Sequence, residues 1–131
     1  MVVDVANPGA LNTALSRLVE QRIDAIVANT SLIFNLRAPL LKFANARHVP
    51  VVGHRAELAE AGALFAYGSS LSEQMRRAAQ LVDKVLKGAS PSELPLEQPT
   101  MFELVVNLKA SSLLGVKVPQ SMLLRADRVI K

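Results

Sequence analysis

Residues 64–107 read LFAYGSSLSEQMRRAAQLVDKVLKGASPSELPLEQPTMFELVVN, and the rest of the chain is arranged around them. Leu64-Phe65-Ala66-Tyr67 predicts a strand, and Gly68-Ser69-Ser70 predicts the turn that leads from it into a helix. We expect this helix to run from Ser70 to about Lys87, and a second strand to form over residues 102–106.

The expected helix carries its own start and stop signals. Ser70 and Glu73 have the spacing of a capping box, in which each side chain binds a free backbone amide at the other residue. Gly88 and then Pro91 end the helix, because neither continues helical geometry well. Apolar residues recur between them at helical spacing: Leu71, Met75, Ala78, Ala79, Val82, Val85 and Leu86. The pattern predicts an amphipathic helix.

A proline-rich connector separates this helix from the second strand. Pro91, Pro95 and Pro99 exclude both a helix interior and a central strand over residues 91–100. A chain that leaves a sheet through a helix and returns through such a connector is either a βαβ unit or a crossing between two lobes. The local pattern leaves both possibilities open.

The remaining chain alternates between short apolar stretches and amphipathic ones. Further strands are expected at 2–5, 23–28 and 48–53, and further helices at 7–21, 36–47, 55–61, 107–114 and 121–130. Residues 29–35 are expected to form a loop or a short turn, because Pro39 fits only the first turn of the helix after them. The alternation predicts an α/β fold, a mainly parallel open sheet with helices on both faces.

The composition excludes several classes of protein. The chain has 131 residues, half of them hydrophobic, which is enough for one domain with a core. Its net charge is +4, but the basic residues are scattered and only 4% of the residues are aromatic, so no nucleic-acid partner is expected. The absence of cysteine excludes disulfides and thiolate metal sites. No apolar run reaches the roughly 18 residues that span a bilayer.

Polar or small residues follow three of the expected strands. They are Asn29, Thr30 and Ser31 after the second strand, Gly53, His54 and Arg55 after the third, and Tyr67 and Gly68 at the end of the fourth. Ligands bind beyond the carboxyl ends of strands in open α/β sheets, and exposed amides and hydroxyls there suit a carboxylate or another anion. We therefore predict a ligand-binding site made of these eight residues.

No catalytic, metal or cofactor site is expected. His48 precedes a strand, at the edge opposite the predicted site, and neither it nor His54 has the spacing of a metal-ligand pair. The chain has no P-loop, dinucleotide-binding, nucleophile-elbow or zinc-protease motif. The residues alone thus favour a binding protein over an enzyme.

Several blocks of sequence resemble one known family in their order and spacing. They are Tyr67-Gly68-Ser69-Ser70, Arg76-Arg77-Ala78-Ala79, residues 82–88, residues 94–100, residues 102–109 and Leu123-Leu124-Arg125-Ala126-Asp127. Together they are similar to the carboxyl-terminal part of ABC-transporter substrate-binding proteins of the tryptophan/tyrosine transport binding-component family, which have the type I periplasmic-binding-protein fold. The similarity covers essentially the whole chain and is strongest over residues 67–130.

The resemblance implies a hinged, two-lobed receptor that closes on a small solute, such as an aromatic amino acid, and delivers it to a membrane permease. Residues 1–66 would form part of the carboxyl-terminal lobe. Residues 67–101 would form the hinge crossing, the long helix of the other lobe and the connector. Residues 102–131 would return to the carboxyl-terminal lobe, and the eight site residues would line the cleft on that side.

The resemblance also implies parts that this sequence does not contain. A full-length member begins with a secretion signal and an amino-terminal lobe, and it works in the periplasm or anchored outside the membrane. The unit whose strand normally lies between 2–5 and 23–28 is also absent. We expect the chain as given to be cytoplasmic, and to form a homodimer through the helix 70–87, with exchange of segment 70–107 as one way of covering its apolar face. A regulatory or association module that dimerises without binding solute is the alternative.

Overall fold

The computed structural model describes all residues, 1–131. Five strands form one sheet in the order β1-β2-β3-β4-β5: β1 (Ile26–Ala28), β2 (Val51–Gly53), β3 (Phe65–Ser69), β4 (Phe102–Asn107) and β5 (Arg128–Ile130). The helices are α1 (Leu11–Glu20), α2 (Ser31–Asn35), α3 (Arg37–Asn45), α4 (Ala56–Glu60), α5 (Leu71–Leu86), α6 (Leu108–Leu114) and α7 (Gln120–Leu123), with 3-10 turns at Pro8–Ala10 and Pro91–Glu93. Three of the four strand pairs are parallel, so the predicted α/β fold with a mainly parallel sheet is confirmed.

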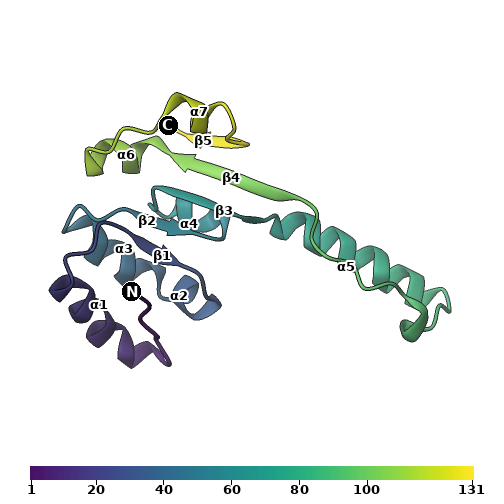
Figure 1. The fold of residues 1–131 in the computed structure, drawn as a ribbon. Helices are drawn as coiled ribbons and strands as arrows, with labels where there is room; N and C mark the ends of the chain where they lie inside the picture. Colours follow the sequence, from purple (N-terminus) through teal and green to yellow (C-terminus); the bar gives the residue numbers. More distant parts are fainter.

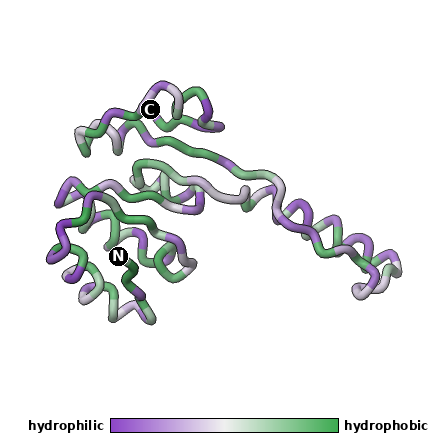
Figure 2. The backbone as a smooth tube through the Cα atoms, viewed as in Figure 1, coloured by the Kyte–Doolittle hydropathy of each residue, from purple (hydrophilic) through white to green (hydrophobic).

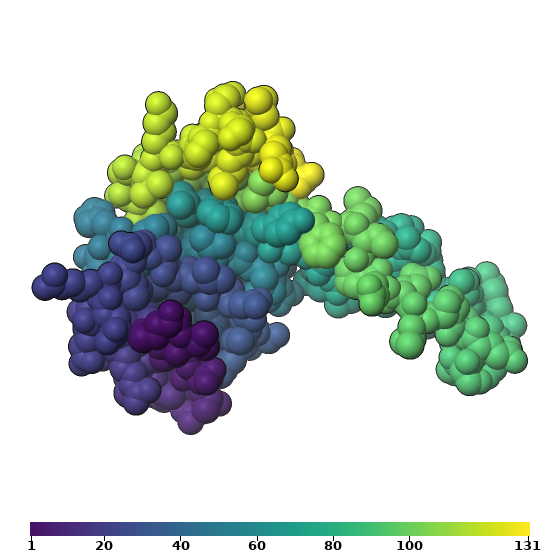
Figure 3. Space-filling view, viewed as in Figure 1, coloured from purple at the N-terminus to yellow at the C-terminus, as the bar shows by residue number.

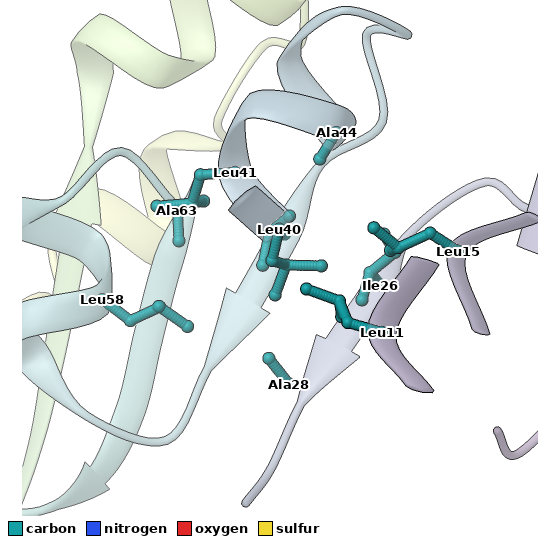
Figure 4. Close-up of a cluster of buried hydrophobic side chains, with 10 residues drawn as sticks. Leu11, Leu15, Ile26, Ala28, Leu40, Leu41, Ala44, Leu58 and Ala63 are labelled. Carbon is teal, nitrogen blue, oxygen red and sulfur yellow. The ribbon is translucent and has the colours of Figure 1, made fainter. Parts of the chain in front are cut away.

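Most of the core lies on one face of the sheet. Leu11 and Leu15 of α1 and Leu40 and Leu41 of α3 pack against β1 and β2, and Leu58 of α4 completes the cluster (Figure 4). These side chains are buried because the helices turn their apolar stripes toward the sheet. This side of the sheet supports the strand ends that carry the predicted site.

The other face of the sheet is covered over only part of its width. There α6 and α7 pack on β3 and β4 through Leu64, Val106 and Val118. Val27 of β1 is 75% exposed, because no helix of this chain lies over that end of the face. Helices do lie on both faces, as predicted, but β1 and β2 are covered on one face alone.

The helix α5 and the connector leave the body of the molecule as an arm (Figure 1, Figure 3). The strands on either side of α5, β3 and β4, are neighbours in the sheet and run antiparallel, with Phe65 opposite Val106 and Ser69 opposite Phe102. A βαβ unit needs parallel strands, so this pairing excludes it. The chain leaves the sheet at the end of β3, forms α5 and the connector, and returns as β4 beside β3. None of the helices, α5 included, combines the length and apolar content that a membrane crossing requires.

The bounds predicted for the long helix are confirmed, but the predicted capping box is wrong. Ser70 is the N-cap residue, yet its side chain makes no cap bond, and its hydroxyl lies 3.0 Å from the Ser72 hydroxyl instead. The Glu73 carboxylate binds Arg76 at 2.6 Å and Arg77 at 3.3 Å. Hydrogen bonding to Arg76 above all lowers the pKa of Glu73. The carboxylate is drawn to two guanidinium groups because they carry the opposite charge and because Arg76 donates two hydrogen bonds to it at once.

The strand predicted over residues 2–5 is also wrong. Residues 1–6 have no regular secondary structure, and β1 is the outermost strand of the sheet. A strand exists only where a neighbouring strand pairs with its backbone, and none lies between residues 2–5 and β1. Val5 packs against the core with its side chain instead.

The helix predicted over residues 121–130 is the third error. Only Gln120–Leu123 is helical there, and Arg128–Ile130 forms β5, parallel to β4. Asp127 starts this strand: its backbone amide donates to Leu104 O at 2.9 Å, and its carboxylate accepts from Leu104 N at 2.7 Å. These bonds to a residue far away in sequence outweigh the weak helical pattern of the segment.

Candidate functional site

The carboxyl ends of β1 and β2 lie side by side. Ala28, the last residue of β1, is paired with Gly53, the last residue of β2. His54 Nδ1 lies 3.3 Å from Ala28 O and links the two strand ends by a hydrogen bond. The segments after the two strands, which hold five of the predicted site residues, therefore start from one fixed edge, and Gly53 is part of that edge. His48, predicted to lie away from the site, is exposed before β2.

Gly68 brings the end of the third strand, β3, into contact with the residue that follows β2. A Cβ atom at this position would lie 1.9 Å from His54 O, so only a residue without a side chain allows so close an approach. Gly68 and Ser69 were expected to form a turn but belong to β3. In the sheet Gly68 pairs with Glu103 and Ser69 with Phe102 of β4. The structure thus places Gly68 against His54, and Gly68 and Arg55 line the same hollow.

The segment after β1 forms the short helix α2, where a loop or turn was expected. Thr30 is its N-cap residue, and its hydroxyl accepts a hydrogen bond from Ile33 N at 3.2 Å. The Thr30 hydroxyl is therefore engaged in holding the helix. Asn29 and Ser31 on either side of it are exposed at the sheet edge.

Tyr67 points away from the other predicted site residues. Successive residues of a strand face opposite sides of the sheet, and Tyr67 lies on the side that carries α7. Its ring stacks on Phe102 with the ring centroids 5.8 Å apart, and it remains exposed. Tyr67 lines a separate groove with Phe65, Leu104 and Met122.

Two residues that the sequence analysis did not single out lie beside the site. The Phe34 ring of α2 lies between two guanidinium groups, 4.3 Å from that of Arg55 and 4.6 Å from that of Arg37. Arg37 also donates to Phe34 O at 3.1 Å. No sequence pattern indicates the contact of Phe34 with Arg55, because it joins two different βα loops.

A hollow of about 190 Å³ lies between the start of α4 and the turn from β3 to α5. Its polar lining includes Arg55, Glu57, Glu60, Ser69, Ser70 and Glu103. Arg128 neutralises two of these groups, since it lies 2.6 Å from Glu60 and 3.7 Å from Glu103. Arg55, the only basic residue of the lining, has one carboxylate nearby, that of Glu57 at 3.8 Å.

The lining of this hollow is rich in hydrogen-bonding groups. Serine hydroxyls, an arginine and a carboxylate supply hydrogen-bond donors and acceptors for a small polar molecule. The chain contains no group of three or more side chains that could hold a metal ion. The start of α5 contributes to the lining as well, through Leu71 and Ser72.

Comparison with known proteins places the chain in a family. A model of the family described as ABC transporter substrate binding protein matches residues 3–130. No curated protein matches the chain significantly.

Solved structures of low sequence identity share the fold. A conserved domain protein from Vibrio cholerae has a TM-score of 0.88 and 23% identity over 97% of this chain. An ABC domain in complex with L-Trp from Streptococcus pneumoniae has a TM-score of 0.90 and 21% identity over 99% of it. A ligand-free, open substrate-binding protein with adhesive properties from Clostridium difficile has a TM-score of 0.64 and 23% identity over 97%.

The match is to less than half of each of these longer proteins. The chain covers 43% of the first, 44% of the second and 42% of the third. The family model, in contrast, accounts for nearly every residue of this chain. The chain belongs to the family of ABC transporter substrate binding proteins.

Proposed function

We propose that this chain forms one wall of the solute cleft in the binding component of an ABC importer. The observation that carries the proposal is the meeting of three strand ends at one edge, with a polar hollow beside the turn into α5. Family membership supports it, because the family consists of solute-binding proteins rather than enzymes. The permease of the importer and an extracytoplasmic location follow from the same proposal.

The solute we propose is a small molecule of amino-acid type. The guanidinium of Arg55 suits a carboxylate, and the hydroxyls of Ser69 and Ser70 suit the remaining polar groups. The Streptococcus pneumoniae structure was determined with L-Trp, which makes an aromatic amino acid the first solute to test.

We further propose that β3 and β4 cross between two lobes at the base of the arm. On this proposal residues 1–66 and 102–131 belong to one lobe, and residues 67–101 contain the crossing, the helix of the second lobe and the connector. The exposed apolar side of α5 supports the division, because a helix with no buried residue of its own needs a partner surface.

A titration followed by amide NMR tests the proposed solute. We expect L-tryptophan at millimolar concentration to shift the amides of Arg55, Ser69 and Ser70, because one wall alone binds weakly but contacts the solute directly. The amide of Arg47, at the opposite edge of the sheet, serves as the unaffected reference. Spectra that stay unchanged with every natural amino acid would contradict the proposal that the solute is an amino acid.

Self-association through α5 is a second candidate function. The arm exposes a stripe of large apolar side chains, among them Met75 at 63% and Leu86 at 82% exposed, and Figure 2 shows apolar and polar residues alternating along its turns. Burying one such side chain fully is worth about 1.5–3 kcal/mol. A second copy of the chain could cover the stripe without any solute.

Light scattering at micromolar concentration decides this second candidate. We expect a dimer, and we expect Met75→Lys with Val82→Lys to convert it to a folded monomer, because two charges in the apolar stripe oppose its burial. Gln80→Lys, on the polar side of the same helix, is the matched control and should leave the dimer intact. A monomeric, folded parent chain would rule out this association.

A further inference from the structure

Arg55 is held on an aromatic ring rather than on a carboxylate. Its guanidinium lies 4.3 Å from the centre of the Phe34 ring, and its side chain is only 26% exposed. A planar guanidinium stacked on a ring is attracted by the π electrons and keeps its N–H edge free for other partners. Phe34 therefore fixes the direction of Arg55 and consumes none of its hydrogen bonds.

Glu57 is the carboxylate to which Arg55 would otherwise bind. The nearest atoms, Arg55 Nη2 and Glu57 Oε1, are 3.8 Å apart, which is beyond hydrogen-bond distance. A formed charge-assisted bond is about 2.7–2.9 Å long. One cationic and one anionic group thus stand close together in the lining of the hollow, and each keeps its hydrogen-bonding capacity.

The other charges around the hollow do not form a second open pair of opposite sign. Arg128 binds Glu60 at 2.6 Å and lies 3.7 Å from Glu103, and Arg55 is the only basic residue of the lining. Arg55 and Glu57 are therefore the pair of opposite charges that remains available to a bound molecule. A cationic and an anionic side chain a few ångströms apart suit a molecule whose own carboxylate and ammonium groups lie close together.

We infer that Phe34 is a positioning residue, which keeps Arg55 apart from Glu57 so that a zwitterionic solute can bind with its carboxylate on Arg55 and its ammonium on Glu57. The inference rests on the proposed function and adds the two charge contacts and the residue that maintains them. Without the ring, Arg55 closes onto Glu57 and the two charges satisfy each other.

The test uses L-tryptophan, tryptamine, which lacks the carboxylate, and indole-3-propionate, which lacks the ammonium. Each is titrated into the chain by amide NMR. We expect the parent chain to bind L-tryptophan at least about tenfold more tightly than either analogue, since each analogue leaves one charge unmatched. We expect Phe34→Leu to bring the three affinities within about threefold of one another. Arg55 and Glu57, once bound to each other, no longer stabilise the carboxylate or the ammonium of the ligand.

Two further variants separate positioning from a merely structural role. Phe34→Tyr keeps the ring face and should restore the preference for L-tryptophan. Arg47→Gln removes the corresponding contact of Arg47 with the Phe43 ring, 4.2 Å away at the other edge of the sheet, and should leave the preference unchanged. If Phe34 only supports the fold, Phe34→Leu weakens all three ligands by the same factor and the preference survives.

The outcomes distinguish the inference from the function on which it rests. A preference for L-tryptophan that Phe34→Leu leaves intact overturns the inference alone. Equal affinity of the parent chain for all three ligands also overturns it, while leaving a solute-binding site. If the parent chain binds none of them or any other amino acid, the proposed function falls, and the inference falls with it.

Discussion

Gly68→Ala should destabilise the fold by about 3 kcal/mol or more, as forced overpacking against a rigid neighbour does. The added Cβ would lie 1.9 Å from His54 O and 2.8 Å from its carbonyl carbon. Both are backbone atoms, which cannot rotate away as a flexible side chain would. The strand β3 would have to move away from the end of β2, and the pairing of Gly68 with Glu103 would be disturbed as well. Urea unfolding followed by circular dichroism measures the loss.

Gly88→Ala is the comparison for this substitution. Gly88 has φ +100, and a Cβ atom added there would have no neighbouring atom within 4 Å, so alanine meets backbone strain alone. Such strain costs on the order of 1 kcal/mol. An equal effect of the two substitutions would mean that β3 does not approach His54 as closely as the structure has it.

Asn107→Ala should cost about 2–4 kcal/mol, the sum of a lost helix cap and an unsatisfied buried group. Asn107 is 4% exposed at the junction of β4 and α6. Its Oδ1 accepts from Ala110 N at 2.9 Å, and its Nδ2 donates to Ala59 O at 2.8 Å. Alanine leaves the buried Ala110 N without a partner, while Ala59 O loses one of its bonds and keeps the one from Gly62 N at 3.1 Å. The midpoint of chemical unfolding reports the change.

Asn7→Ala is the matched control for Asn107. Asn7 makes the same kind of cap, its Oδ1 accepting from Ala10 N at 3.1 Å, but it is exposed. Water replaces the lost bond there, so we expect a cost of about 0.5–1 kcal/mol, at the low end for a cap. If Asn107→Ala costs no more than Asn7→Ala, the link to Ala59 adds nothing to stability.

Gly68 and Asn107 each fix an element that contributes to the candidate site. Gly68 holds the β3 end against His54, and Asn107 ties the returning strand to α4, the helix that begins beside Arg55. The parts of the hollow that β3 and α4 supply are therefore both tied to the sheet. The arm formed by α5 starts at its rim, since Ser70 lines the hollow and caps the helix.

The helices were largely predictable because their information is local. The long helix ends where Gly88 follows it, and helical turns begin near residues 7 and 107 as expected, capped there by Asn7 and Asn107. Gly115 adopts the left-handed conformation that ends α6. The order of strands and helices, and with it the α/β class and the edge that carries the site, follows from the same short-range patterns.

The errors concern pairing partners that are distant in sequence. The sequence alone could not decide that residues 2–5 have no neighbouring strand or that residues 128–130 do have one. In each case a local preference of small size competes with a contact that only the assembled structure supplies.

The same distinction applies to residues 64–107. Their sequence determined a strand, a helix of defined length, a stiff connector and a second strand, because periodicity, glycine and proline act within a few residues. Only the tertiary structure decided that β4 returns antiparallel beside β3, that Gly68 touches His54 and that Arg55 lies on Phe34. Backbone pairing and ring stacking depend on atoms brought together by folding, and no spacing within the sequence encodes them.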